Sequence, residues 1–248
     1  MNSVMNKNRI FRLICLFIAF MMMIFVIGTE MISRNAYKPQ ERALQSMESG
    51  QHIEVKENLE YIVFESKDMS NGKGIIFYPG GSVDEESYAP LMYALAEEGY
   101  LCAIARMPFY LAVLDVNAAD DILEELGTDT EWYIAGHSLG GSMAAAYAED
   151  NGDKIKGVIL LASYSTNDLK DDDLRVLSIY GSEDGILNME RYNKHTANLP
   201  EDFREVVLMG GNHSNFGYYG LQEGDGVAGM TAEVQQERTL RAIVDFVK

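Results

Sequence analysis

Hydrophobic positions divide the chain into an apolar N-terminal segment and a longer region of short apolar runs. Residues 13–28 carry no charged or strongly polar side chain, and a helix of about twenty apolar residues spans the core of a bilayer. We therefore predict a basic N-terminal segment at residues 1–9, an uncleaved transmembrane signal-anchor helix at 10–29 and a polar stalk at 30–50. A cleaved signal peptide is the alternative, although the residues after the apolar core form only a poor cleavage site.

The rest of the chain, residues 51–248, shows two different hydrophobic patterns. Residues 52–56 and 61–65 alternate between apolar and polar side chains, which predicts an edge hairpin with one solvated face. Continuous apolar runs then predict buried strands at residues 74–78, 100–105, 132–135, 157–162, 176–180 and 205–209. Helical patterns lie at residues 87–99, 117–127, 139–151 and 232–247.

Buried strands separated by helices indicate an α/β fold with a mostly parallel central sheet flanked by helices. Residues 51–248 suffice for one sizeable core and are too few for two domains, so we predict a single domain. In such sheets the chemistry collects at the carboxyl ends of the strands. Functional side chains are therefore expected directly after the apolar runs. The connection between the strands at 157–162 and 176–180 is too short to contain an inserted lid domain.

The amino-acid composition argues against several kinds of binding partner and site. The chain has 38 acidic and 20 basic residues, a formal net charge of −18, which argues against nucleic-acid binding and against electrostatic docking on anionic lipid. Cys15 lies in the apolar helix and Cys102 in a predicted strand, so the two cysteines provide no disulfide framework. The four histidines lack the spacing of metal ligands, and we expect no metal.

Basic residues around the apolar helix indicate its orientation. Lys7, Arg9 and Arg12 precede the helix with no acidic residue among them, which favours an N-terminus inside the cell. Basic residues also follow the helix, and they weaken this bias. We expect a single-pass protein of the cell membrane whose remaining domain lies outside the cytoplasm.

The most specific motif is Gly136-His137-Ser138-Leu139-Gly140, which follows a predicted strand and opens a predicted helix. A serine at such a sharp turn exposes its hydroxyl, and the flanking glycines remove the side chains that would collide there. This arrangement is typical of a nucleophile elbow and makes Ser138 the candidate nucleophile. A structural glycine turn is the alternative, so the motif needs partners at other strand ends.

Two later residues supply such partners. Asp184 lies in a turn after a predicted strand, where a carboxylate can orient an imidazole. His213 lies in a polar loop after the last predicted strand, where an imidazole can take the serine proton. Glu183 and Asp168 are rival candidates for the acidic position. We predict a catalytic triad of Ser138, Asp184 and His213.

The glycine pair in the segment 78–82, Tyr-Pro-Gly-Gly-Ser, follows the first buried strand. Glycines there allow a backbone N–H to approach a substrate oxygen closely. We predict an oxyanion hole formed by the N–H groups of Gly81, or of Ser82 in its place, and of Leu139. Taken alone, the Pro-Gly-Gly sequence is also an ordinary turn signal.

Residues 70–248 resemble the alpha/beta-hydrolase superfamily, and more closely its dienelactone-hydrolase-like group, alpha/beta-hydrolase family 5. The resemblance rests on residues 77–81, 106–108, 136–141, 180–185 and 211–213. It implies an α/β-hydrolase fold, a Ser–His–Asp triad and no cofactor. Pro79 stands where many relatives have a histidine. Ser138 stands where the dienelactone hydrolases proper have a cysteine nucleophile, so their specific activity is not implied.

These expectations describe a membrane-anchored serine hydrolase that cleaves an ester-like acyl bond through an acyl-enzyme intermediate. A site without a lid suits a small or accessible acyl substrate, and we expect a small-molecule acyl substrate as the partner. Acyl transfer to a hydroxyl or an amine would use the same residues. A non-catalytic binding protein that retains the fold is the alternative from a different class.

Overall fold

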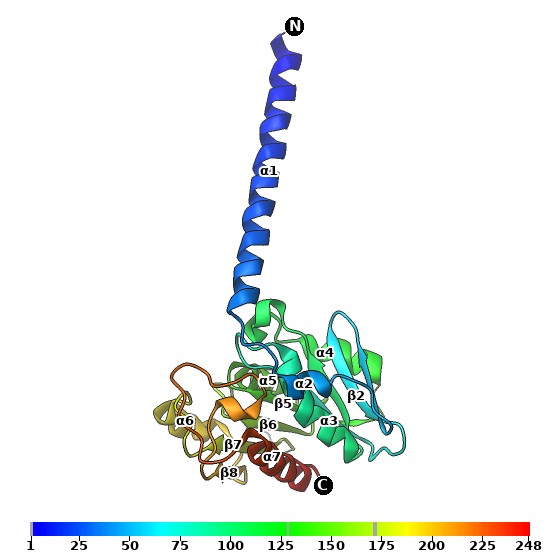
Figure 1. The fold of residues 1–248 in the computed structure, drawn as a ribbon, viewed down its shortest axis with the longest axis vertical. Coiled ribbons are helices and arrows are strands. Elements are labelled where there is room, and N and C mark those ends of the chain that lie inside the picture. The colour runs from blue at the N-terminus through cyan, green and yellow to red at the C-terminus, as the bar shows by residue number, and fades with distance from the viewer. Residues whose placement is uncertain (1, 128, 171–172) are drawn as a thin grey trace. The chain divides into compact units, whose positions relative to one another are not determined.

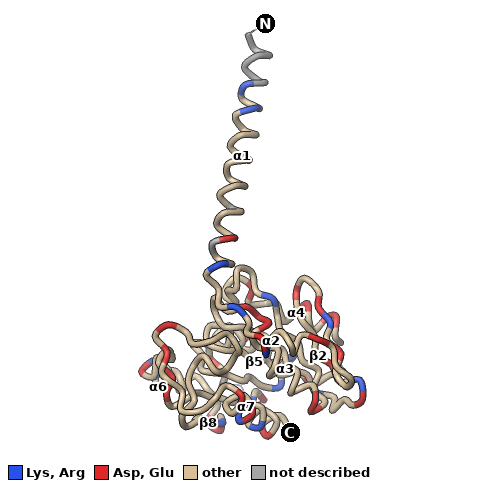
Figure 2. Tube along the Cα trace, in the orientation of Figure 1, with Lys and Arg blue, Asp and Glu red and all other residues tan. Residues whose placement is uncertain are grey.

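The computed structural model describes residues 2–127, 129–170 and 173–248, which form two compact units with a boundary between Ala36 and Tyr37. The first unit is the helix α1 (Asn2–Asn35). Within it, Arg9–Asn35 is long and apolar enough to cross a membrane by length and composition, a test that a signal sequence also passes. Figure 2 shows that the charged residues drawn on α1 lie toward its two ends, with an uncharged middle.

The second unit begins earlier than the sequence pattern predicts. Residues 37–50, predicted to be part of a stalk, belong to it. Tyr37 forms an isolated parallel bridge with Val83, and the short helix α2 (Glu41–Gln45) buries Ala43. Backbone hydrogen bonds help to hold this segment, such as the one from Tyr37 N–H to the carbonyl of Ser82 (2.8 Å). No side-chain pattern records such bonds, so hydrophobic periodicity could not place the boundary.

One sheet organises the second unit (Figure 1). Its strand order is β1-β2-β4-β3-β5-β6-β7-β8, with antiparallel pairing from β1 to β2 and from β2 to β4 and parallel pairing beyond. The strands are β1 (Ile53–Glu57), β2 (Tyr61–Ser66), β3 (Lys73–Tyr78), β4 (Leu101–Ala105), β5 (Glu131–His137), β6 (Gly157–Leu161), β7 (Arg175–Gly181) and β8 (Arg204–Leu208). The α/β fold class and the mostly parallel sheet are therefore confirmed.

Two hydrophobic cores cover the two faces of the sheet. Alternate residues of β3 show the division, because Ile75 packs in one core and Ile76 in the other. The first core contains α3 (Ala89–Glu97) and α7 (Ala232–Val247), and the second contains α4 (Ala118–Leu126) and α5 (Leu139–Asp150). Strands buried on both faces need apolar side chains at every position, which explains the continuous apolar runs.

The remaining helices are short. A further α-helix, α6 (Met189–His195), follows β7. The 3-10 helices are η1 (Glu85–Tyr88), η2 (Pro108–Tyr110), η3 (Ala112–Leu114), η4 (Thr196–Asn198) and η5 (Ser214–Phe216). The helix predicted at residues 87–99 is divided between η1 and α3, where the backbone changes from 3-10 to α geometry. The described part of the connection from β6 to β7 contains no helix, as expected for a site without an inserted lid.

Candidate active site

Ser138 occupies a strained turn between β5 and α5. Its backbone has φ 52° and ψ −120°, a region that costs a non-glycine residue about 1–3 kcal/mol. A Cβ atom on Gly140 would lie 2.2 Å from the carbonyl oxygen of Tyr78, and one on Gly136 would lie 2.5 Å from the carbonyl carbon of Gly140. Only glycine fits at either position. The turn therefore has the geometry that the sequence motif predicts.

Two other serines fix the backbone of this turn. Ser163 donates a hydrogen bond from Oγ to the carbonyl of Ser138 (2.7 Å). Ser142 lies 3.2 Å from Ser163, oxygen to oxygen, and donates to the carbonyl of Tyr164 (2.9 Å). Ser163 directly follows β6, the strand next to β5. The strained backbone of Ser138 is therefore held by a hydrogen bond from a neighbouring strand.

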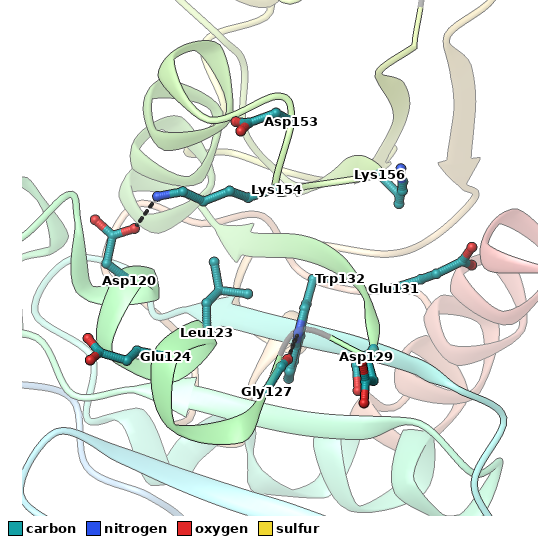
Figure 3. Close-up of a pocket in the computed structure, with 11 residues that line it drawn as sticks. Asp120, Leu123, Glu124, Gly127, Asp129, Glu131, Trp132, Asp153, Lys154 and Lys156 are labelled. Atoms are coloured by element: carbon teal, nitrogen blue, oxygen red, sulfur yellow. Dashed lines mark hydrogen bonds and ion pairs between the residues drawn. The ribbon is translucent and has the colours of Figure 1, made fainter.

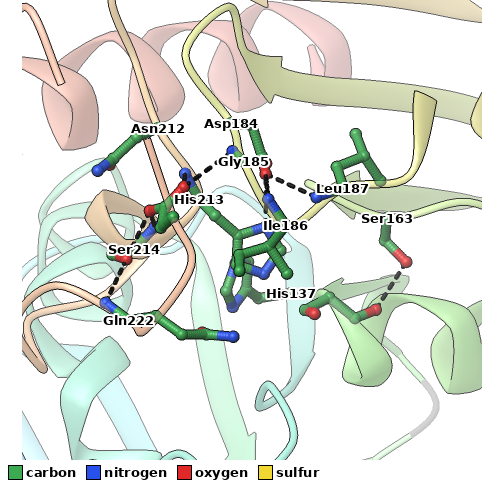
Figure 4. A network of polar contacts seen from close by, with 12 residues as sticks. His137, Ser163, Asp184, Gly185, Ile186, Leu187, Asn212, His213, Ser214 and Gln222 are labelled. Carbon is green, nitrogen blue, oxygen red and sulfur yellow. Dashed lines mark hydrogen bonds and ion pairs between the residues drawn. The ribbon is translucent and has the colours of Figure 1, made fainter. Parts of the chain in front are cut away.

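Asp184 and His213 form a buried pair at the ends of β7 and β8. His213 Nδ1 lies 2.9 Å from Asp184 Oδ2, and both side chains are only 1% exposed. The other carboxylate oxygen, Oδ1, accepts hydrogen bonds from the N–H groups of Ile186 (2.9 Å) and Leu187 (2.7 Å), as Figure 4 shows. The carboxylate is thus held from both sides, and its orientation fixes the imidazole.

The rival carboxylates have other partners. Glu183 accepts a hydrogen bond from the hydroxyl of Ser182 (2.9 Å). Asp168 accepts one from the backbone N–H of Lys170 (3.2 Å). Of the three acidic candidates, the structure brings Asp184 to His213.

Ser138 and His213 line one cavity of about 210 Å³. Leu139, Tyr164 and Leu187 also contribute to its wall. His213 Nε2 is buried and has no hydrogen-bond partner among the described residues. An unpaired buried ring nitrogen is costly, and here it belongs to the histidine that shares the cavity with the candidate nucleophile.

The predicted oxyanion donors lie next to each other. A Cβ atom on Gly81 would touch the Leu139 side chain at 3.0 Å. Leu139 is the first residue of α5, so its N–H has no partner within the helix. The N–H of Ser82 donates to the carbonyl of Tyr110 (2.9 Å) and is therefore occupied. Of the two alternatives in this loop, the geometry favours Gly81.

A comparison with protein families identifies the family of most of the second unit. Residues 74–237 match the model of the alpha/beta hydrolase family. The chain belongs to the alpha/beta hydrolase family. This confirms the superfamily indicated by the sequence motifs. The search of curated proteins found no sequence match.

Solved structures share the fold of this alpha/beta hydrolase at low sequence identity. A predicted CIB-like hydrolase from Thermoplasma acidophilum is 18% identical (TM-score 0.59, 79% of this chain and 98% of that one). A carboxylesterase from Bacillus subtilis is 12% identical (TM-score 0.57, 84% and 96%). A dienelactone hydrolase from Anabaena variabilis is 10% identical (TM-score 0.59, 79% and 99%). At these identities the likeness concerns the fold.

A larger cavity, of about 700 Å³, lies at the start of β5 and the end of α4 (Figure 3). Its charged lining includes Asp120, which is paired with Lys154 at 2.8 Å. It lies at the opposite end of β5 from Ser138, away from the edge of the sheet where α/β proteins collect their chemistry. Among the described residues, no group of His, Cys, Asp and Glu side chains could hold a metal ion. The smaller cavity is therefore the candidate active site.

Sequence reasoning missed Asp225, which holds two parts of the candidate site together. Its Oδ1 accepts from the N–H groups of Gly185 (3.0 Å) and His213 (3.2 Å), and its Oδ2 accepts from the N–H and hydroxyl of Ser214 (2.8 and 2.6 Å). Burial opposes ionisation, but the hydrogen bonds from Ser214, Gly185 and Gly226 outweigh it and lower the pKa of Asp225. The carboxylate thus joins the turn of Asp184 to the loop of His213. An isolated aspartate in a glycine-rich loop gives no such signal in the sequence.

We predict that Asp225→Asn weakens both stability and turnover. The asparagine NH₂ would face backbone donors, and lost hydrogen bonds to a charged group cost about 1.5–3 kcal/mol each. A loosened triad should lower kcat about 10- to 100-fold with little change in KM, because small misplacements are costly in catalysis. Ester turnover and thermal unfolding would be measured beside Glu223→Gln, an exposed control in the same loop. Equal effects of the two variants would contradict this positioning role.

His137 lies beneath the candidate triad and is fully buried. Its ring centroid is 4.4 Å from that of His213. Tyr88 accepts a hydrogen bond from the N–H of Gly80 (3.1 Å), which leaves its own hydrogen to be donated to His137 Nδ1 (2.9 Å). Burial, and then the proximity of His213, hold the pKa of His137 well below 6.5. A neutral His137 thus links the glycine loop to the turn of Ser138.

Because His137 is buried and neutral, we predict that the folded domain loses stability in acid. The unfolded chain binds a proton on His137 near pH 6.5, whereas the folded chain does not, because its pKa is lowered. The free energy of unfolding should therefore fall as the pH drops below about 6.5, by at most about 1.4 kcal/mol per pH unit from this group. In His137→Asn, the melting temperature measured from pH 7.5 to 5 should fall less steeply. Parallel curves for the two proteins would contradict the prediction.

Proposed function

We propose that this alpha/beta hydrolase is a serine hydrolase that cleaves an ester-like acyl bond, anchored in the cell membrane by α1 with its catalytic domain outside the cytoplasm. One observation carries the proposal. His213, which forms a buried pair with Asp184, lines the same cavity as Ser138, and its Nε2 has no hydrogen-bond partner among the described residues. An imidazole oriented by a carboxylate, in the same cavity as a hydroxyl on a strained turn, is the arrangement needed to activate that hydroxyl.

The first half of the reaction would form an acyl-enzyme. Ser138 Oγ attacks the carbonyl carbon while His213 Nε2 takes the hydroxyl proton. The N–H groups of Gly81 and Leu139 would hold the negative oxygen of the tetrahedral intermediate, each worth about 2.7–4 kcal/mol. The C–O bond to the leaving group then breaks, and His213 returns the proton to the departing alkoxide.

The second half would release the acid. Water takes the place of the alcohol, gives its proton to His213 Nε2 and attacks the acyl carbon. The bond to Ser138 Oγ breaks, and the serine regains its proton from the imidazolium. Asp184 stays ionised and stabilises the imidazolium in both halves. The Bacillus subtilis protein with this fold is named a carboxylesterase, which supports an ester as the substrate class.

An activity-based probe tests the proposal directly. The full chain in detergent micelles should react with a fluorophosphonate and should hydrolyse p-nitrophenyl esters, whose acyl chains can be varied from acetate upward. A folded protein that neither reacts nor hydrolyses any ester would overturn the proposal. Protease treatment of intact cells should remove a C-terminal tag, and protection of the tag would contradict the proposed location of the domain.

A further inference from the structure

Two loops beside the candidate active site expose large apolar side chains. The loop after β4 exposes Val113 (52%) and Leu114 (55%), and the loop after η5 exposes Leu221 (61%) and Val227 (83%). We call these four residues the apolar rim. Single exposed apolar residues are common, but several on adjacent loops indicate an interaction surface.

The segment that follows α1 is bonded to both loops of the apolar rim. Lys38 Nζ donates to the hydroxyl of Tyr110 (3.2 Å) in the first loop. Gln40 N–H donates to the carbonyl of Tyr218 (2.7 Å), and the hydroxyl of Tyr37 accepts from the N–H of Glu223 (3.0 Å) in the second loop. The point where the chain enters the domain therefore lies against both loops.

The same loops adjoin the candidate active site. The carbonyl of Tyr110 accepts from the N–H of Ser82, next to the proposed oxyanion donor Gly81. In the second loop, Asp225 binds the backbone of His213. The apolar rim is therefore built on the elements that hold the candidate oxyanion donor and the candidate base.

Chain length limits how far the apolar rim can lie from a membrane. In the structure, the candidate membrane span is Arg9–Asn35; its last apolar residue is Ile32, and Tyr37 follows five residues later. Even a fully extended chain covers about 3.6 Å per residue, so Tyr37 lies within about 18 Å of the hydrocarbon core. A domain tethered this closely meets the bilayer surface at a high local concentration.

We propose that the apolar rim docks on the surface of the bilayer that holds α1, so that the candidate active site takes its ester from the lipid–water interface. The inference rests on the proposed function, specifically on α1 as a membrane anchor. Side chains of this kind insert at the boundary between headgroups and acyl chains. The net charge of −18 disfavours attraction to anionic lipid. Docking would therefore depend on apolar contacts and would occur on phosphatidylcholine, which has no net charge.

Site-specific fluorescence in vesicles tests the docking. The full chain, with Cys15→Ser, would be reconstituted in phosphatidylcholine vesicles after labelling Val113→Cys with an environment-sensitive fluorophore. The native Cys102 is buried and its thiol pKa is raised by burial, so it should not react. Leu59→Cys is the matched control, because Leu59 is a 95% exposed leucine in the turn between β1 and β2.

If the rim docks, the emission of the fluorophore at position 113 should shift to the blue, and lipids with brominated acyl chains should quench it. The fluorophore at position 59 should show neither effect. Solvent-exposed emission at both positions would overturn the proposal. A blue shift at 113 without lipid quenching would also overturn it and would assign the rim to a protein partner or a second copy. Flotation with the vesicles and fluorophosphonate labelling of the same sample report separately on the anchor and on the serine.

A second variant measures the consequence for substrate choice. Replacing Val113 and Leu114 by aspartate should lower the hydrolysis of a long-chain ester dissolved in the vesicles, relative to that of soluble p-nitrophenyl acetate. Loss of two inserted aliphatic side chains should reduce this ratio about tenfold or more. Leu59→Asp should leave the ratio at the wild-type value. An unchanged ratio in the rim variant would overturn interfacial uptake of substrate.

Discussion

Replacement of Ser138 by alanine is expected to lower kcat/KM for an ester about 10⁴- to 10⁶-fold, the range found when a triad serine is removed. The fold should persist, because the hydrogen bonds of Ser138 to its surroundings use backbone atoms. Its N–H donates to the carbonyl of Leu161 (2.9 Å), and its carbonyl accepts from Ser163 (2.7 Å). Alanine keeps the same Cβ at the same strained φ, so the turn is unchanged.

Three measurements would check this result: ester turnover, fluorophosphonate labelling and the melting temperature. Ser142→Ala is the matched control, since Ser142 is another serine of the same cavity. The Ser142 variant should still be labelled, and the Ser138 variant should not. Labelling that survives in Ser138→Ala, or that disappears only in Ser142→Ala, would place the nucleophile elsewhere.

Asp184→Asn should reduce kcat about 10⁴-fold with the fold retained. The asparagine oxygen can still accept from the N–H groups of Ile186 and Leu187, as Oδ1 of Asp184 does now. Its NH₂ group then faces Nδ1 of His213 and donates to it. The imidazole must carry its proton on Nε2 instead, and an Nε2–H cannot accept the proton of Ser138.

The rival acidic residues provide the controls for this second variant. Asp168→Asn and Glu183→Gln remove a carboxylate charge at nearby strand ends without touching the imidazole. Both should keep most of the wild-type kcat. A loss in either variant as large as that in Asp184→Asn, or full activity of Asp184→Asn, would refute the assignment of the acidic residue.

Local sequence was sufficient to predict the strands and the turn of Ser138. Continuous apolar runs predicted the inner strands because each is buried on both faces, as Ile75 and Ile76 show by packing in opposite cores. The turn was predictable because its steric requirements fall on residues only two positions apart in the chain. Gly136, Ser138 and Gly140 meet one another and the adjacent backbone within a single strand–helix junction.

The sequence could not decide which acidic residue pairs with His213. Asp184, Glu183 and Asp168 all follow predicted strands, and only the parallel register of β7 and β8 brings one of them to His213. Asp225 could not be found at all, since its hydrogen bonds reach Gly185 across forty positions of chain. Such contacts depend on how loops fold over the end of the sheet.

The sequence by itself determined the strands, the α/β class and the strained turn, because hydrophobic burial and steric fit act between residues close in the chain. The tertiary structure decided the pairing of Asp184 with His213, the hydrogen bond from the His213 backbone to Asp225 and the inclusion of residues 37–50 in the domain. These depend on hydrogen bonds between distant segments. A polar or backbone group can accept many partners, so its sequence neighbourhood does not specify which one it finds.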